Sequence, residues 1–210
     1  LRHGWGRCEY ANGDKYEGNG WDDRRGGGQG LFEQLSLMHG DEHIGLWKDD
    51  LKFCQGHMQY ANGDDYTGLW VNDHMHGYGK LVFAATGNVY EGEFDMGVMK
   101  GQGTMHYANG DKYVGWWAGD ERNGEGVMAY ADMSIYRGTF GNGRRTGPSF
   151  FRWPNGAYMH VVNEDDEPTG PVSMASLHYP NGDAYVGPLT DGVTLRRQGK
   201  GTQVLAKPLV

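Results

Sequence analysis

The sequence predicts an all-β protein, an elongated and twisted antiparallel sheet built from consecutive β-hairpins. Nearly the same word occurs at 10–18 (YANGDKYEG), 60–68 (YANGDDYTG) and 107–115 (YANGDKYVG), and a short word repeated at long intervals indicates a repeat architecture. Apolar and polar residues alternate around each copy, as they do in a half-buried strand. The chain also combines 37 glycines with 13% aromatic residues. That composition is typical of neither collagen nor a disordered chain, so we expect a folded protein.

The repeats follow one another through the whole chain. A partial repeat over residues 1–15 comes before eight repeat starts, which are 22 to 27 residues apart, at Tyr16, His43, Tyr66, Tyr90, Tyr113, Tyr136, Tyr158 and Tyr185. No stretch is left for a second domain, so we predict a single array over residues 1–210.

Each repeat has the pattern of a hairpin. In the copy that begins at Tyr90, residues Tyr90, Gly92 and Phe94 share one face of a first strand, because successive side chains point to opposite faces. Residues 103–107 alternate again and predict the second strand. The dipeptide at 109–110, Asn-Gly, predicts a two-residue type I′ turn into the next hairpin, and it recurs at 12–13, 62–63, 155–156 and 181–182.

Aromatic residues recur at fixed positions of the hairpins and predict a stacked ladder on one face. Glycines such as Gly68 stand between two first-strand aromatics, where the missing side chain lets a ring lie across the backbone. Cys8 falls in a second apolar column with Met58 and Met105, which favours a buried filler over a nucleophile. We predict that the ladder lines a shallow groove that binds a partner protein through Tyr66, Trp70, Tyr90, Phe94, Tyr113, Trp117, Tyr136 and Phe140.

The pattern Tyr-x-Gly-x-Trp/Phe-x-x-Gly-x-x-x-Gly-x-Gly-x-x-x-Tyr-x-x-Gly resembles the MORN repeat (membrane occupation and recognition nexus) over residues 4–205. The units at 16–42 and 158–184 depart from it, and His43 replaces a tyrosine. The resemblance implies a non-enzymatic structural scaffold of the cytoskeleton or of the membrane–cytoskeleton interface, which self-associates and binds cytoskeletal or adaptor proteins. Two alternatives stay open. One is an adaptor that binds a peptide or helix in the aromatic groove, and the other is a phosphoinositide-binding regulatory region of a larger protein.

Composition narrows the range of partners and compartments. The formal charge is −8, which disfavours general attraction to nucleic acid, and we expect none as a partner. Two cysteines and the lack of a signal-like or transmembrane-length apolar run predict a reducing compartment, the cytoplasm. The resemblance to the MORN repeat implies a cytoskeleton-associated and membrane-proximal location there. Because Leu1 falls within a repeat, we expect the chain to be part of a longer protein.

The sequence shows no spacing that predicts catalysis. No phosphate-binding loop with a following helix and no Ser-His-Asp arrangement stands out, so we predict no enzyme and no cofactor. The carboxylates of the Asn-Gly turns, such as Asp64 and Asp111, are interpreted as solvated turn residues. Cys54-x-x-His57 and His74-x-His76 are the only metal-like spacings, and they do not provide four convergent ligands, so no metal site is predicted.

Basic residues recur at the hairpin turns and could face phosphoinositide headgroups. We expect any such contact to be weak and electrostatic, carried by Arg144, Arg145, Arg196 and Arg197. Aspartates stand in the same turns, and a charge-balanced, solvated edge is the alternative interpretation.

The C-terminal end predicts a homodimer. A last strand over 201–206 has no further Asn-Gly turn after it, and an open edge strand is a template for pairing with another chain. Two identical edges related by a two-fold axis can satisfy each other. We predict contacts through Tyr179, Tyr185, Val204, Leu205 and Leu209.

Overall fold

The structure is a computed structural model, and it describes residues 4–9, 15–21, 24–25, 32–38, 40–49, 51–168, 175–187 and 202–204. Side chains are described for residues 40–49, 51–166 and 176–184. Within these ranges every regular element is a β-strand, which confirms the predicted all-β class. The backbone divides into two compact units, Leu1–Ala108 (unit 1) and Asn109–Val210 (unit 2), both built from hairpins.

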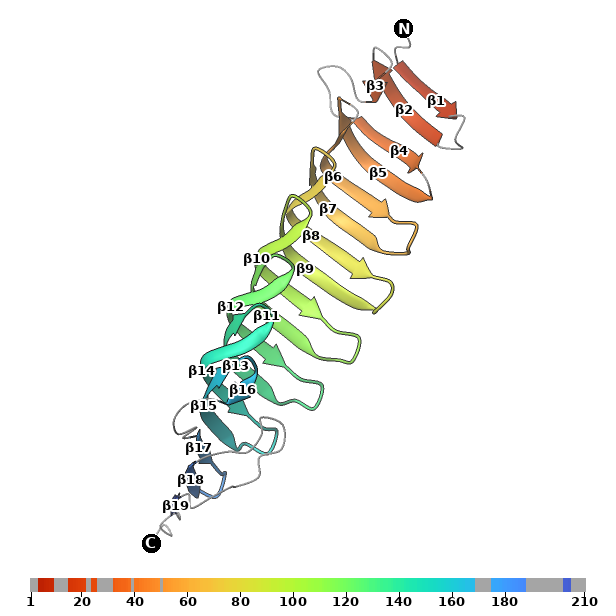
Figure 1. Ribbon diagram of the computed structural model, residues 1–210. Helices are drawn as coiled ribbons and strands as arrows, with labels where there is room; N and C mark the ends of the chain where they lie inside the picture. Colours follow the sequence, from red (N-terminus) through yellow and green to blue (C-terminus); the bar gives the residue numbers. More distant parts are fainter. Residues whose placement is uncertain are drawn as a thin grey trace. The chain divides into compact units, whose positions relative to one another are not determined.

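Unit 1 stacks its strands side by side in chain order (Figure 1). Each strand pairs antiparallel with the next, except that β2 pairs with both the short β3 and β4. The strands are β1 (Gly4–Glu9), β2 (Lys15–Trp21), β3 (Arg24–Arg25), β4 (Phe32–Met38), β5 (Asp41–Lys48), β6 (Leu51–Gln59), β7 (Asp65–Val71), β8 (His74–Phe83), β9 (Asn88–Asp95) and β10 (Val98–His106).

Unit 2 repeats this arrangement. Its strands pair antiparallel in chain order, and β15 pairs with both the short β16 and β17. They are β11 (Lys112–Ala118), β12 (Glu121–Ala129), β13 (Ile135–Gly141), β14 (Arg144–Arg152), β15 (Tyr158–Glu164), β16 (Glu167–Pro168), β17 (Ala175–His178), β18 (Ala184–Gly187) and β19 (Thr202–Val204). The prediction of consecutive antiparallel hairpins is therefore confirmed within both units.

The Asn-Gly connections are turns, but the predicted type I′ geometry is wrong for them. In the connection from β6 to β7, only Gly63 has a positive φ, 89°. Its amide donates to the Tyr60 carbonyl at 2.8 Å, and the Asp64 amide donates to Asn62 Oδ1 at 2.9 Å. This is a type I turn closed by a left-handed glycine, in which the asparagine side chain holds the following backbone.

Positive φ values at both central residues, which type I′ requires, occur at the opposite end of the hairpins. Asn72 and Asp73 have φ of 49° and 69°, and Asn142 and Gly143 have 50° and 78°. The sequence word for this tight turn varies from repeat to repeat. Asn, Asp and Gly tolerate the left-handed region best, and Met96, with φ of 50°, is an exception among the described turns.

The aspartates of the Asn-Gly turns link successive connections. The Ala84 amide donates to Asp64 Oδ1 at 2.8 Å, and in unit 2 the Ala131 amide donates to Asp111 Oδ1 at 2.8 Å. The interpretation of these carboxylates as merely solvated was wrong. Each one satisfies an amide twenty residues further along the chain, which explains why the word is repeated so closely.

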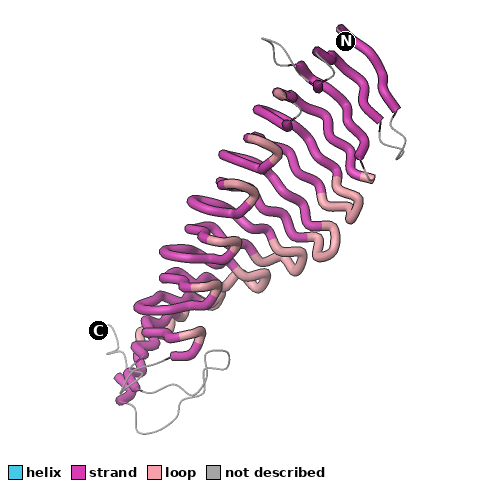
Figure 2. The backbone as a smooth tube through the Cα atoms, turned by 45° about the horizontal axis from the view of Figure 1, so that its top comes forward, coloured by secondary structure: helices cyan, strands magenta, loops and turns pink. Residues whose placement is uncertain are grey.

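A β-bulge kinks each of the central hairpins. The register shifts between Gly45 and Trp47 in unit 1, for example, and between Gly138 and Thr139 in unit 2. A residue with positive φ stands in the second strand at each bulge, where a bulge bends and twists the strand. These residues are Cys54, Gly77, Gly101, Gly124 and Gly147. Within each unit Figure 2 shows the strands curling toward the tight-turn end.

Candidate protein-binding surfaces

The eight aromatic residues predicted to line a groove lie in the interior of the hairpins. Tyr66, Tyr90 and Tyr113 are 0% exposed, and none of the eight is more than 5% exposed. The predicted ladder is therefore present, but its rings face one another rather than an open groove. Binding of a partner by these rings stays a prediction, and it requires that the hairpins open.

Neighbouring rings of the ladder meet edge to face. Tyr66 contacts Trp70 of its own hairpin at a centroid distance of 5.1 Å and Phe94 of the next hairpin at 5.3 Å. His43 takes the tyrosine's place one hairpin earlier, with Trp47 at 5.1 Å and Trp70 at 5.4 Å. This geometry suits the ring quadrupoles and joins one hairpin to the next. Unit 2 repeats it with Tyr113, Trp117, Tyr136 and Phe140.

Glycines make room for each tyrosine ring, as predicted. A Cβ added to Gly68 would lie 2.6 Å from Cζ of Tyr66, and one added to Gly79 on the next strand would lie 2.5 Å from its Cε2. The Tyr66 hydroxyl then donates to the Leu69 carbonyl at 2.9 Å, a carbonyl that lies at the bulge. Burial raises the pKa of Tyr66, so the phenol stays a hydrogen-bond donor.

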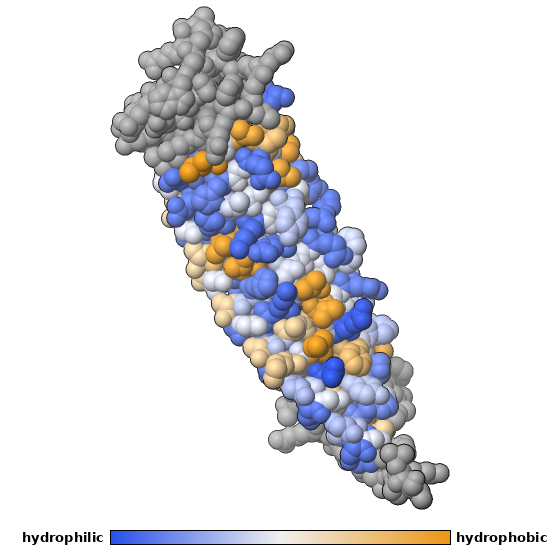
Figure 3. All heavy atoms as spheres, turned by 180° about the vertical axis from the view of Figure 1, so that it is seen from behind, coloured by the Kyte–Doolittle hydropathy of each residue, from blue (hydrophilic) through white to orange (hydrophobic). Residues whose placement is uncertain are grey.

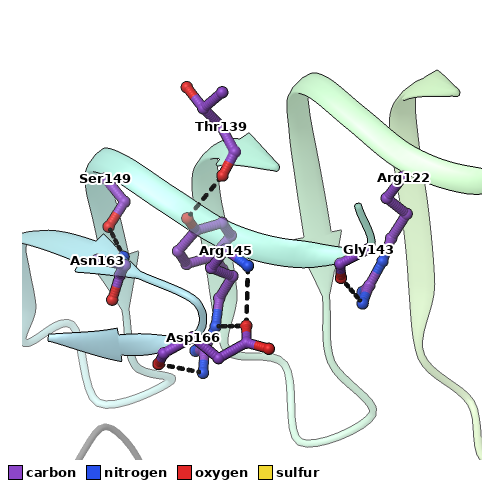
Figure 4. A network of polar contacts seen from close by, with 8 residues as sticks. Arg122, Thr139, Gly143, Arg145, Ser149, Asn163 and Asp166 are labelled. Atoms are coloured by element: carbon purple, nitrogen blue, oxygen red, sulfur yellow. Dashed lines mark hydrogen bonds and ion pairs between the residues drawn. The ribbon is translucent and has the colours of Figure 1, made fainter. Parts of the chain in front are cut away.

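Cationic side chains cover the ladder from the tight-turn end. The Lys52 Nζ lies 5.1 Å from the centroid of the Trp70 ring and 3.6 Å from Asp73 Oδ1. In unit 2 the Arg122 guanidinium lies 5.0 Å from the Phe140 ring and donates to the Gly143 carbonyl (Figure 4). These are cation–π contacts that stabilise the ladder itself.

Arg145 is held by the same kind of contacts. Its guanidinium lies 5.6 Å from the Tyr136 ring, and its Nε donates to Asp166 Oδ1 at 2.9 Å (Figure 4). Burial by itself would raise the pKa of Asp166, but hydrogen bonds and charge from Arg145 lower it. Of the four arginines predicted to contact a headgroup, Arg145 is therefore engaged, and Arg144 is exposed beside Asp165 at 3.7 Å. Arg196 and Arg197 lie outside the described residues.

The ladder changes character after Tyr136. Ser149 takes the place of the second glycine, and it accepts a hydrogen bond from Asn163 Nδ2 at 2.7 Å (Figure 4). Phe151 pairs with Met159, which is 5% exposed, so Met159 and not Tyr158 occupies the tyrosine position. The turn that begins at Trp153 has the same hydrogen bonds as the turn that begins at Tyr60. Tyr158 therefore stands one residue before the tyrosine position, where Asp65 stands in the earlier hairpin.

The outer faces of the hairpins carry the exposed side chains. We call the side opposite the aromatic ladder the outer face, since strand residues alternate between the two sides. On unit 2 it bears exposed aliphatic and aromatic residues, with exposures from 37% to 50%, at Val114, Trp116, Ile135 and Val162. Figure 3 shows such apolar patches interleaved with hydrophilic residues on one side of the molecule.

The C-terminal residues predicted to form a dimer are described only in part. Tyr179 packs against a small core of Met159, Val161 and Leu177. The side chains of Tyr185 and Val204 are not described, and Leu205 and Leu209 lie outside the described residues. The strand β19 pairs with β18, and within the described part of the chain no strand pairs with its other edge. The dimer through this edge stays a prediction.

The metal-like spacings do not converge in the structure. Cys54 lies in the left-handed region at a bulge of β6, with φ of 57°, where the next hairpin has Gly77 with φ of 60°. His57 Nε2 lies 2.6 Å from Asp65 Oδ2, and His76 Nδ1 lies 3.6 Å from Asp95 Oδ1. Among the side chains that the structure describes, no group of three His, Cys, Asp or Glu residues could hold a metal ion. No helix in the described part of the chain is long and apolar enough to cross a membrane.

Kinked hairpins with a buried tyrosine–tryptophan ladder over paired glycines define a β-hairpin repeat protein. The family model of the MORN repeat matches residues 1–15, 43–65, 66–85, 90–112, 113–132 and 136–158, which together make up more than half of the chain. The chain belongs to the MORN repeat family. Residues 16–42 and those beyond 158, which include the two units that depart from the repeat pattern, are not matched by the family model.

Solved structures provide more distant comparisons. The chain is similar to the TCP10 domain of Danio rerio CPAP, with 14% identity, a TM-score of 0.49, and coverage of 97% of this chain and 90% of that chain. It is also similar to the TCP domain of Drosophila melanogaster SAS-4 (dCPAP), in complex with a proline-rich motif of Ana2 (dSTIL), with 16% identity, a TM-score of 0.43, and coverage of 87% and 89%. At such scores these proteins say nothing of this chain's partners. No curated protein matches the sequence.

Proposed function

We propose that this chain is a non-enzymatic scaffold that binds partner proteins at the cytoskeleton or at the membrane–cytoskeleton interface of the cytoplasm. The observation that carries the proposal is that each hairpin buries its ladder residues against its neighbours and exposes the residues of its outer face. The ladder residues pack against one another and hold the repeats together, and Tyr66, Tyr90 and Tyr113 are fully buried. The outer faces are left to vary, as they do in repeat proteins that bind along extended surfaces.

The outer faces are more accessible to a partner protein than the buried aromatic ladder. A peptide or helix that reached the ladder would have to displace cation–π contacts such as those of Lys52 and Arg122. A partner on the outer face would meet Trp116 and Val162, which are 49% and 50% exposed, without any rearrangement. Exposed aromatic and aliphatic residues of this kind are enriched at protein interfaces.

Self-association through the C-terminal edge forms part of the proposal. β19 has three residues and pairs with β18 only through Thr202, Gln203 and Val204 in the described part of the chain. A homodimer in which this edge pairs with its copy would be held by backbone hydrogen bonds and apolar contacts, so it should persist at high salt. The Val204→Lys/Leu205→Lys double variant should then be monomeric by light scattering in high salt, whereas the parent chain is dimeric.

Detergent extraction of cells that express the tagged full-length chain tests the scaffold proposal. The chain should remain in the cytoskeletal pellet after the membranes are dissolved. Replacing exposed Trp116 and Val162 with serine should release it into the supernatant, while the Tyr78→Ser variant, which changes another exposed ring, should not. A parent chain that is fully extracted by detergent would overturn the proposal.

Of the four arginines predicted to contact a phosphoinositide headgroup, Arg144 is the one with a described side chain that is not held by the ladder. Its side chain is 61% exposed, and the contact to Asp165 at 3.7 Å is long and solvated. Screening by salt should remove such binding. Association with phosphoinositide vesicles at about 0.5 M salt would contradict this weak electrostatic mode, since the Debye length is then only a few ångströms.

A further inference from the structure

The outer face of unit 2 holds cations without partners. Among the residues with described side chains, every other lysine and arginine contacts a carboxylate, a carbonyl or a ring, as in the pairs Lys80–Glu91 and Lys100–Asp95. Lys112, Arg137 and Arg152 are exposed and make no such contact with any described residue. All three lie on the outer face of β11, β13 and β14, where Glu125 on β12 is an exposed acid.

Apolar side chains separate these cations. Val114 pairs with Val127 across β11 and β12, and Arg137 then stands between Val127 and Phe150 in the same cross-strand row. A polyphosphate or a membrane surface would leave the exposed Val114 and its neighbours in contact with charge. The formal charge of −8 also repels polyanions. The outer face of unit 2 therefore fits a protein surface on which carboxylates lie among apolar groups.

The outer face of unit 1 has that chemistry. It bears carboxylates on β5, β7 and β9, at Glu42, Asp65, Glu91, Glu93 and Asp95. Lys80 contacts Glu91 at 3.2 Å, Lys100 contacts Asp95 at 2.7 Å, and His57 contacts Asp65 at 2.6 Å. The carboxylates still outnumber the lysines of this face, and the side chains of Asp65 and Glu91 remain 40% and 38% exposed. Ile44, at 37% exposure, and Tyr78, at 63%, provide apolar area beside the acids.

The charges of the two faces stand at equivalent positions of the repeat. Asp65 comes directly before the buried Tyr66, as Lys112 comes before Tyr113, and Glu91 follows Tyr90 as Arg137 follows Tyr136. Asp65 and Glu91 lie on equivalent strands of two successive hairpins, and so do Lys112 and Arg137. Since hairpins repeat at about 10 Å, twice the strand spacing, the acidic pair and the basic pair have the same separation with opposite sign.

We propose that a second copy of this chain packs the outer face of its unit 1 against the outer face of unit 2. Carboxylates at Asp65 and Glu91 of one copy meet Lys112 and Arg137 of the other, and the apolar residues between them are covered. The contact is sheet against sheet, it is separate from the C-terminal edge, and it is weakened by salt. With a second contact besides the edge, the chain can extend into assemblies larger than a dimer.

Sedimentation of the full-length chain at increasing concentration tests this contact. The experiment uses the Val204→Lys/Leu205→Lys background, so that pairing at the C-terminal edge does not contribute. Self-association should be present at low salt and weaken when the salt is raised. Reversing Lys112 and Arg137 to glutamate should weaken it by about tenfold or more, because like charges then face each other. The Arg144→Glu variant, whose charge lies at the tight-turn end, should associate as the parent does.

A charge swap separates lost contact from lost folding. The Asp65→Lys/Glu91→Lys chain should also fail to self-associate, and an equimolar mixture of the two reversed chains should form a hetero-complex. Circular dichroism reports whether each reversed chain is folded, and the milder Lys112→Gln/Arg137→Gln and Asp65→Asn/Glu91→Gln chains replace any that are not. With these, each neutral chain should associate more weakly than the parent. A monomeric parent at low salt, association unchanged by reversal or neutralisation, or folded reversed chains that do not combine would overturn the proposal.

Discussion

Gly92 and Gly103 face each other across the β9–β10 pair so closely that a Cβ on Gly92 would lie 2.6 Å from the Cα of Gly103. The Tyr90 ring lies over both glycines, and its hydroxyl would be 2.5 Å from the same added Cβ. Two backbones and one ring therefore share a space that admits no side chain. The tyrosines can be buried only because glycines occupy the facing positions of the paired strands.

Gly92→Ala should lower the free energy of unfolding strongly, by about 3 kcal/mol, the upper end of the range for overpacked sites. The added methyl meets backbone, which cannot turn aside as a side chain can. Urea denaturation measures the loss. Gly141→Ala is the matched control, because a Cβ there meets only Thr146 Cγ2 at 3.6 Å, and it should change stability by less than about 0.5 kcal/mol. Equal effects at the two sites would contradict the close-contact explanation.

Tyr90→Phe should cost about 1 kcal/mol, the usual net value of one hydrogen bond. The ring keeps its edge-to-face contact with Phe94 at 5.1 Å, but the hydroxyl that donates to the Glu93 carbonyl at 3.0 Å is lost. Thermal or urea unfolding would detect the difference. Tyr78→Phe serves as the control, since Tyr78 is 63% exposed, and its midpoint should not move. A Tyr90→Phe chain as stable as the parent would show that the ring alone holds the ladder.

The sequence contained enough to predict the hairpins, the columns and the reason for the glycines. Those follow from strand alternation and from a word repeated in register. It did not predict where the type I′ turns lie, because Asn-Gly fits two turn types. The φ angles of the turn and the hydrogen bonds of Asn62 and Asp64 distinguish them. The sequence pattern placed the repeat start at Tyr158 instead of Met159, because a tyrosine stands one residue before the position that the strand pairing defines.

The candidate site was harder to predict than the fold. Exposure of the ladder depends on the bend at each bulge, and a bend is a property of backbone angles that no single residue type reveals. The partnership of Arg145 with Asp166 links residues 21 apart in the sequence. Whether a cation of the outer face is engaged depends on the residue opposite it on the neighbouring strand, as Glu91 stands opposite Lys80.

Cys54→Gly should raise stability by about 1 kcal/mol, the approximate cost of a non-glycine residue in the left-handed region. Cys54 has φ of 57° at a bulge where the equivalent hairpins use glycines such as Gly77, with φ of 60°. Urea denaturation under reducing conditions provides the measurement. Cys54→Ser keeps the strained backbone and should give no such gain, so a serine variant as stable as the glycine variant would attribute the effect to the thiol.

Asp166→Asn should lower stability at neutral pH and leave it nearly unchanged in acid. Arg145 lowers the pKa of Asp166 in the folded state, below the value of about 3.9 for an unfolded aspartate. The pair therefore contributes fully above about pH 4 and loses its contribution as the pH falls through the folded pKa. Urea midpoints of the parent and the variant should differ at pH 7 and converge as the pH falls below the folded pKa, where the carboxyl is protonated in both states. Asp165→Asn is the control, because Asp165 lies 3.7 Å from Arg144 with 74% of its side chain exposed, and it should show little difference at either pH. Parent and Asp166→Asn curves that run parallel across this range would mean that Asp166 stabilises the turn through its backbone alone.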